Sequence, residues 1–307
     1  MKKENEEKGN FKSMLATLGI TSSVSYVSYE LFSETLFNRI FKTRKSDKDY
    51  DVDGMYLKWL SNSNVDEVMI NSFDGLTLSG YRIYNHDTKN YLILVPGLNE
   101  NKTSLYHAAY AFDKLGYNIL LIDNRGNGNS EGEHVTYGYK EHLDIIKWIG
   151  YLTNKVDDVK ICLYGVSLGA SSICMALGSV LPENVKCAVE DSGYSTFEEE
   201  LEYVLLNKYR IKVPKVLSTI AGMKLKEKFN ITLSDINPKE SLMNNEIPIC
   251  FVHSKNDEIV PYSMGKKLYN ANKGFKKFYI LNNESHACGY MNPNYFSVIN
   301  SFISNFM

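Results

Sequence analysis

A serine between two glycines is the feature of this sequence that most clearly indicates a reactive site. Residues 165–169 read Gly-Val-Ser-Leu-Gly, after an apolar run at 160–164 and before a stretch at 168–181 that is typical of a helix. Strand, G-x-S-x-G and helix together predict a nucleophile elbow, a tight turn that lifts the serine above a sheet edge. Only glycine fits on either side, because the turn crowds the strand against the helix. The pattern therefore predicts that Ser167 is a nucleophile.

A nucleophilic serine needs a base, and the base needs an acid that orients it. Hydrolases with such an elbow carry the three side chains in the order Ser, Asp or Glu, His. Two histidines follow Ser167: His253 lies in an apolar run, and His286 lies in a polar loop after the strand expected at 277–281. A loop at a strand end suits a base, so His286 is the predicted base. His253 is expected to hydrogen-bond its own turn.

Three acidic residues are candidates for the orienting acid. Asp257 follows the strand expected at 248–252, in a loop on the same sheet edge as the nucleophile and the base. Asp191 ends the strand expected at 185–190, a position that some hydrolases use for the acid, and it could instead cap the following segment. Glu258 is adjacent to Asp257 but should point elsewhere. The order of preference is Asp257, then Asp191, then Glu258.

These side chains need a scaffold in which strands alternate with helices. The first expected strands alternate in polarity, whereas the later ones are continuous apolar runs, which fit a sheet covered on both faces. This order predicts an α/β fold with a mostly parallel, doubly wound sheet. Strands are expected at 65–73, 76–84, 91–95, 117–122, 160–164, 185–190, 248–252 and 277–281, and helices at 102–115, 137–152, 168–181, 263–272 and 293–306.

Four motifs in order resemble the alpha/beta-hydrolase superfamily, in particular small bacterial hydrolases near its serine aminopeptidase and prolyl-oligopeptidase branches. They are an early hairpin at 74–81, the loop DNRGNGNSEG at 123–132, the elbow at 164–170 and an acid loop that reads D-x-x-V-P from Asp257. The resemblance runs from about Val65 to the C-terminus. It implies an eight-stranded, mostly parallel sheet with helices on both faces and a helical lid between strands six and seven.

The oxyanion hole is expected from two backbone N–H groups. The elbow aims the N–H of Leu168 and the helix N-terminus at the place where negative charge develops. The loop after the strand at 91–95 usually reads H-G-x in the family, and here it reads Pro-Gly-Leu-Asn at 96–99. The residue after the glycine, Leu98, is the second expected donor. The proline removes an N–H that this role does not require.

The expected lid is the insertion at about 193–245, which is rich in aromatic and aliphatic residues. Most of these residues should pack the lid onto the body. Tyr194 and Phe197 are the best candidates for contact with a substrate, because they lie closest in sequence to the sheet edge.

The composition fits a globular enzyme. With 307 residues and 44% hydrophobic residues, the chain can form one large domain plus a lid. A net charge of −2 gives no electrostatic case for binding nucleic acid. The five cysteines lack paired spacing, and Cys162, Cys187 and Cys250 lie in apolar runs, as reduced core residues do. Metal-ligand spacings and phosphate loops are missing from the sequence, so neither metal nor cofactor is expected.

The first part of the chain, 1–45, is expected to be a charged and helical lead before the hydrolase domain at 46–307. Residues 1–12 are highly charged, 13–29 carry no charge, and 30–41 show the polar and apolar faces of a helix. The uncharged run is short for a membrane-spanning helix and lacks a cleavage site. We expect a helix packed on the body of a cytoplasmic protein. Attachment to a membrane surface through this segment is the alternative.

Together these features predict a serine hydrolase that cleaves carboxylic esters or related small acyl compounds through an acyl-enzyme. Two alternatives stay open. The first is an aminopeptidase-like or amidase-like hydrolase, because the lid decides the leaving group. The second is a catalytically silent binding module on the same scaffold, because a fold does not establish a function.

Overall fold

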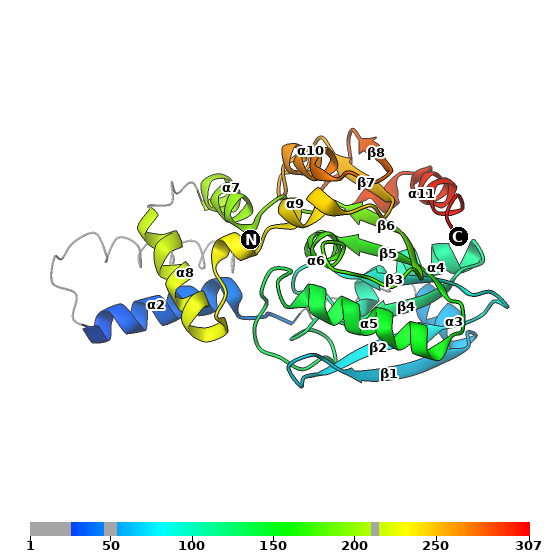
Figure 1. Cartoon of the computed structure of the whole chain (residues 1–307), viewed down its shortest axis with the longest axis horizontal. Helices are drawn as coiled ribbons and strands as arrows, with labels where there is room; N and C mark the ends of the chain where they lie inside the picture. The colour runs from blue at the N-terminus through cyan, green and yellow to red at the C-terminus, as the bar shows by residue number, and fades with distance from the viewer. Residues whose placement is uncertain (1–25, 46–53, 210–214) are drawn as a thin grey trace. The chain divides into compact units, whose positions relative to one another are not determined.

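The structure is a computed structural model that describes residues 26–45, 54–209 and 215–307 (Figure 1). Over these residues the strands are β1 (Val65–Asn71), β2 (Thr77–Ile83), β3 (Asn90–Val95), β4 (Asn118–Ile122), β5 (Lys160–Val166), β6 (Val185–Asp191), β7 (Ile249–Ser254) and β8 (Lys276–Leu281). The α-helices are α2 (Tyr26–Phe41), α3 (Met55–Ser61), α4 (Tyr106–Lys114), α5 (Glu141–Lys155), α6 (Leu168–Ala176), α7 (Phe197–Tyr209), α8 (Lys215–Phe229), α9 (Pro238–Ser241), α10 (Tyr262–Ala271) and α11 (Tyr295–Ile303). Short 3₁₀ turns are η1 (Lys102–Leu105), η2 (Leu233–Asp235), η3 (Leu242–Asn244) and η4 (Gly289–Met291).

One sheet of the described residues contains all eight strands, in the order β1-β2-β4-β3-β5-β6-β7-β8. β2 is antiparallel to both β1 and β4, and the other neighbours are parallel. The eight strands predicted from the sequence are therefore confirmed, as is the mostly parallel sheet. Because the carboxyl ends of parallel strands meet at one edge, the loops after β3, β5, β7 and β8 leave the sheet on the same side.

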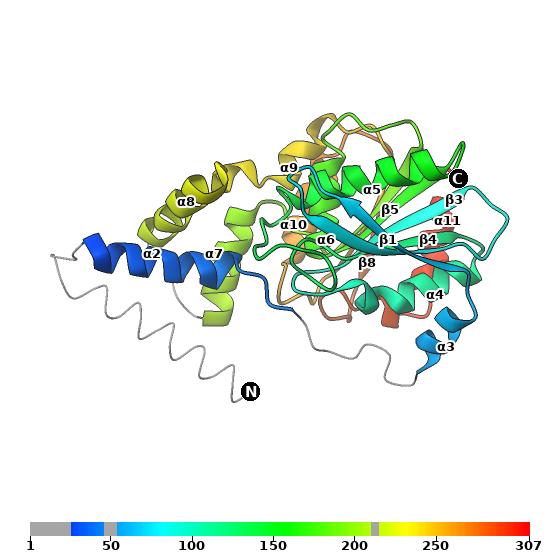
Figure 2. The same cartoon turned by 90° about the horizontal axis from the view of Figure 1, so that it is seen from below.

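Helices cover both faces of the sheet, as the apolar strands predicted (Figure 2). Consecutive side chains of a strand point to opposite faces. In β3, Leu92 and Leu94 belong to a buried cluster with residues of α4 and α11, whereas Ile93 and Val95 belong to another with residues of α5 and α6. A strand buried in this way must be apolar at every position, which explains its continuous run.

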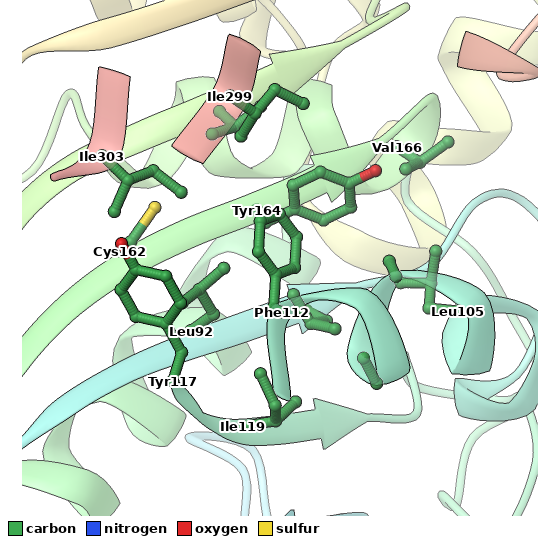
Figure 3. Packing of buried hydrophobic residues seen from close by; sticks show 14 of the residues in the cluster. Leu92, Leu105, Phe112, Tyr117, Ile119, Cys162, Tyr164, Val166, Ile299 and Ile303 are labelled. Atoms are coloured by element: carbon green, nitrogen blue, oxygen red, sulfur yellow. The ribbon is translucent and has the colours of Figure 1, made fainter. Parts of the chain in front are cut away.

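Aromatic packing holds β5 in the middle of the sheet (Figure 3). The ring of Tyr164 meets the ring of Phe112 from α4 edge to face, with 5.5 Å between the ring centroids. The Tyr164 hydroxyl lies 2.8 Å from the hydroxyl of Tyr295 on α11. Ile299 of α11 belongs to the same cluster. The strand that ends at the predicted nucleophile is therefore fixed by side chains from two helices.

The helix predicted at 137–152 begins later than expected, at Glu141. Tyr137 and Gly138 have φ angles of 48° and 96°, which no α-helix contains. The Glu141 carboxylate accepts hydrogen bonds from the N–H groups of Thr136 at 2.9 Å and Gly138 at 2.8 Å. This side chain stabilises the left-handed turn and starts the helix behind it, and apolar periodicity does not register such a contact.

The described residues divide into two compact units, and each is described by itself. The larger unit contains residues 42–200 and 234–307, including the whole sheet, and the smaller contains α2 and residues 201–233. The predicted division of the chain at residue 45 stays a prediction, and residues 1–25 of the expected lead lie outside the described residues. None of the helices described here is both long enough and apolar enough to cross a bilayer.

Within the smaller unit, α2 packs against α8 of the insertion. Four residues from these helices form a buried cluster: Phe32, Leu36, Leu217 and Ala221. On the polar side, the Lys224 ammonium lies 2.6 Å from the Glu30 carboxylate. The two faces predicted for residues 30–41 are therefore present, and the partner that the structure gives them is a helix of the insertion.

Candidate active site

Ser167 lies in the turn between β5 and α6, in a backbone conformation that side chains rarely adopt. Its φ is 55° and its ψ is −117°, and its N–H donates to the Asp191 carbonyl at 2.8 Å. A Cβ atom at Gly165 would lie 2.6 Å from the backbone of Gly169, and one at Gly169 would lie 2.2 Å from the Val95 carbonyl oxygen. Such strain persists where the surroundings impose it, and it is typical of functional sites.

The close approach at Gly169 predicts a large loss of stability for Gly169→Ala. The added methyl group would meet backbone carbonyls of Val95 and Pro96, which cannot rotate away. We expect the free energy of unfolding to fall by about 1–3 kcal/mol or more, measured by urea denaturation. Gly150→Ala is the matched control, because nothing lies within 4 Å of a Cβ there. In the middle of α5 that change should raise stability by about 0.5–1 kcal/mol, and equal effects of the two changes would contradict the prediction.

His286 lies in the loop after β8 and bridges two of the other predicted residues. Its Nδ1 lies 2.7 Å from Asp257 Oδ2, and its Nε2 lies 2.9 Å from Ser167 Oγ. A carboxylate can only accept, so Nδ1 carries the proton and donates to Asp257. Nε2 is then the free acceptor for the Ser167 hydroxyl. This tautomer is the one that can take a proton from serine.

Asp257 is held rigidly in the loop after β7. Its Oδ1 accepts the backbone N–H groups of Ile259 and Val260, both at 2.9 Å. Its Oδ2 lies 2.7 Å from His286 Nδ1 and 3.4 Å from His253 Nε2. Burial by itself would raise the pKa of Asp257, but hydrogen bonds from His253 and His286 outweigh burial and hold it at about 2. The carboxylate is therefore ionised at neutral pH. It can stabilise a positive charge on the imidazole beside it.

The rival candidates from the sequence do not contact Ser167 through their side chains. His253 is buried in β7, and its Nε2 donates to the Val260 carbonyl at 2.9 Å, so it bonds its own turn as expected. The same atom lies 3.4 Å from Asp257 Oδ2. Asp191 is buried as well and accepts hydrogen bonds from the hydroxyls of Ser192 and Tyr295. It does not cap α7, which begins only at Phe197. Glu258 is exposed.

The two residues predicted to supply the oxyanion hole, Leu98 and Leu168, line the same cavity as Ser167. In the described part of the chain, the N–H groups of Leu98 and Leu168 donate to no protein acceptor. Asn124 Nδ2 donates to the Pro96 carbonyl at 2.9 Å and so fixes the loop that carries Leu98. The same loop runs close to the nucleophile, since a Cβ at Gly97 would lie 3.7 Å from the Ser167 Cβ. The proline at position 96 is therefore compatible with Leu98 and Leu168 as the expected N–H donors.

A cavity of about 290 Å³ opens beside Ser167 and His286. All the residues that line it belong to the larger unit. Tyr194 lines the cavity, and its hydroxyl donates to the Tyr137 carbonyl at 2.6 Å. Phe197 does not line it among the described residues; its ring stacks on that of Tyr137, with 3.9 Å between centroids. Of the two predicted contact residues, the structure brings only Tyr194 to the cavity wall.

Among the lining residues that the sequence analysis did not predict, three carry an acidic or aromatic side chain: Glu100, Tyr137 and Glu200. Tyr137 was assigned to a helix, which hid its left-handed turn. Glu200 stands in a run of three glutamates at the start of α7, and such runs usually form a solvated helix face. Helical periodicity could have separated Glu200 from its neighbours, but it could not have shown what Glu200 faces.

Known proteins resemble this chain at several levels. A family model described as alpha/beta hydrolase fold matches residues 90–212. The chain is 28% identical to the uncharacterized protein YqkD of Bacillus subtilis (strain 168) over 294 residues, 95% of each chain. Among solved structures it resembles the esterase Pf2001 of Pyrococcus furiosus, with a TM-score of 0.68, 21% identity and coverage of 86% of this chain and 99% of that one.

A second solved structure with this fold is the acylaminoacyl peptidase of Pyrococcus horikoshii. The TM-score is 0.60 and the identity 17%, over 86% of this chain and 44% of the peptidase. The eight-stranded sheet and the structural relatives define an alpha/beta-hydrolase fold. The family model over residues 90–212 describes the same fold and supports the resemblance to the alpha/beta-hydrolase superfamily that the sequence predicted.

Proposed function

We propose that this protein is a serine hydrolase that cleaves carboxylic esters through an acyl-enzyme. The observation that carries the proposal is the position of His286, which lies within hydrogen-bond distance of both Ser167 and Asp257. Nucleophile, base and acid in such a row form the arrangement that activates a serine hydroxyl. The similarity to an esterase fold supports the same class of reaction.

Acylation begins at the Ser167 hydroxyl. As its Oγ bonds to the carbonyl carbon of the substrate, His286 Nε2 takes the proton, and Asp257 stabilises the imidazolium. The electron pair of the C=O bond moves to oxygen, where the N–H groups of Leu98 and Leu168 donate to it. The carbonyl then re-forms, the bond to the alcohol oxygen breaks, and His286 gives its proton to that oxygen. The products of this half-reaction are a free alcohol and an ester on Ser167.

Deacylation repeats the sequence with water as the nucleophile. His286 takes a proton from the water while the oxygen of the water bonds to the acyl carbon. The same two N–H groups stabilise the second oxyanion, and Ser167 leaves with the proton that His286 returns. A cavity of about 290 Å³ is small for a ligand site, so short acyl chains are the expected substrates.

Leu98→Pro tests the oxyanion hole directly, because it deletes a backbone donor that no ordinary side-chain change removes. We expect kcat for a nitrophenyl ester to fall by about 10²- to 10³-fold. Leu98→Ala is the control, since it shortens the side chain and keeps the N–H. Circular dichroism and Tm report whether both variants fold. A folded Leu98→Pro variant with the kcat of Leu98→Ala would exclude this N–H as a donor.

A peptidase or amidase is the second candidate, because the acylaminoacyl peptidase shares the fold. Turnover of short-chain nitrophenyl esters against aminoacyl-arylamides separates the two. We expect the esters to be cleaved and the arylamides to react far more slowly. A fluorophosphonate probe should label Ser167; intact protein without a label, together with no ester turnover, would point to a catalytically silent binding module.

A further inference from the structure

Glu200 is a buried residue on the wall of the candidate active site, and one oxygen of its carboxyl group has no hydrogen-bond partner among the described residues. Only 8% of the residue is exposed, and it lines the cavity beside Ser167 and His286. Its Oε2 atom is out of reach of solvent and has no hydrogen-bond donor in the described part of the chain. Buried polar groups nearly always have a partner, so this oxygen needs an explanation.

The neighbouring glutamate shows that the local fold can satisfy a carboxylate. Glu199 accepts a hydrogen bond from the Ser195 hydroxyl and lies 2.9 Å from the Lys267 ammonium. Burial raises the pKa of Glu200 to about 8; the Asp257 carboxylate acts in the same direction and His253 acts against them. Without a ligand the group is therefore mostly neutral at pH 7, and a bound cation would favour its ionised form. If position 200 served only to close the cavity, a smaller or apolar side chain would fill it at a lower cost in free energy. The position therefore points to a ligand that supplies the missing partner.

The rest of the cavity wall suits a positive charge. Glu100 adds a second carboxyl group, and Tyr137 and Tyr194 add aromatic residues, which attract cations through their ring faces. Among the described residues, no lysine or arginine lines the cavity. An anionic acyl group would meet two acidic side chains without compensation. A cationic group would gain from both of them.

We propose that the substrate of this protein carries a positively charged nitrogen in its acyl or leaving group, and that Glu200 is the residue that binds this charge. The inference rests on the proposed function and adds the substrate class to it. A charge-assisted contact in a small, largely apolar cavity is among the stronger polar contacts in proteins. It is also specific, because a neutral group of the same shape leaves the carboxyl group unpaired.

Matched ester pairs test the proposal. Butyrylcholine is compared with its carbon isostere, in which a quaternary carbon replaces the quaternary nitrogen of the alcohol. A second pair places the same exchange in the acyl group, as nitrophenyl esters of trimethylglycine and of its carbon isostere. For at least one pair we expect kcat/KM of the wild-type protein to favour the cation by about tenfold or more.

Glu200→Gln keeps the size of the side chain and removes its charge. The preference for the cation is expected to fall by about tenfold, with the neutral isostere as the internal reference. Glu198→Gln is the matched control, because Glu198 is exposed in the same helical turn. It should leave the preference unchanged. Equal kcat/KM values within both wild-type pairs, or an undiminished preference in Glu200→Gln, would overturn the proposal.

A binding measurement separates this inference from the proposed function. Choline should raise the Tm of the wild-type protein more than its carbon isostere does, and Glu200→Gln should remove the difference. The fluorophosphonate probe reports on Ser167 independently. Labelled protein that treats choline and its isostere alike refutes the cation site and leaves the hydrolase. Unlabelled protein that still binds choline through Glu200 refutes the hydrolase and leaves the cation site.

Discussion

Replacing Ser167 by alanine is expected to lower kcat for short-chain nitrophenyl esters by about 10⁴- to 10⁶-fold. The change removes the only atom that can bond covalently to the acyl group in the proposed reaction. His286 and Asp257 then have no nucleophile to activate, so their contribution is lost with that of the serine. The oxyanion donors and the cavity remain, and they alone give about 10³- to 10⁴-fold acceleration over water.

The measurement uses burst kinetics and fluorophosphonate labelling of the folded variant. Loss of the label should accompany loss of turnover, because both need the same oxygen atom. Ser301→Ala is the control, since Ser301 is exposed on α11 and does not line the cavity. If Ser167→Ala retained more than about one hundredth of the wild-type kcat, another nucleophile would have to do the chemistry.

Asp257→Asn is expected to lower kcat by about 10⁴-fold, although the two side chains have the same shape. The amide oxygen can still accept from Ile259 and Val260, so its NH₂ group faces His286 Nδ1. A donor there requires Nδ1 to be an acceptor, which moves the ring proton to Nε2. In that tautomer Nε2 cannot accept the Ser167 proton, and the charge that stabilised the imidazolium is gone as well.

Two comparison variants make this test specific. Glu258→Gln removes an exposed neighbouring charge and should leave kcat close to wild type. Asp191→Asn addresses the rival acid, whose carboxylate faces Ser192 and Tyr295, so its effect on kcat should be far below that of Asp257→Asn. The opposite ranking, in variants with a wild-type Tm, would assign the orienting acid to Asp191.

Local pattern was enough to predict much of the scaffold. The central strands were readable because a strand buried on both faces is apolar along nearly its whole length, as β3 and β5 are, and the first strands were readable from their alternating polarity. The elbow was readable for a related reason. Its turn leaves no room for a Cβ at Gly165 or Gly169, so both positions require glycine. Chain order then predicted Asp257 and His286, whose catalytic roles the variants above test.

Side-chain contacts that hydrophobic periodicity does not show decided the rest. Glu141 stabilises a left-handed turn at Tyr137, so the predicted helix begins later than expected and the tyrosine lies on the cavity wall. Glu200 and Glu199 are chemically identical neighbours, yet one finds Lys267 and the other faces the cavity.

The sequence by itself determined the fold and the order of the reactive side chains, because burial and steric exclusion act on each residue where it stands. Only the tertiary structure decided which polar groups find partners. A partner can come from a distant segment that folding brings close, as Lys267 does for Glu199, and local hydrophobic periodicity does not show such contacts.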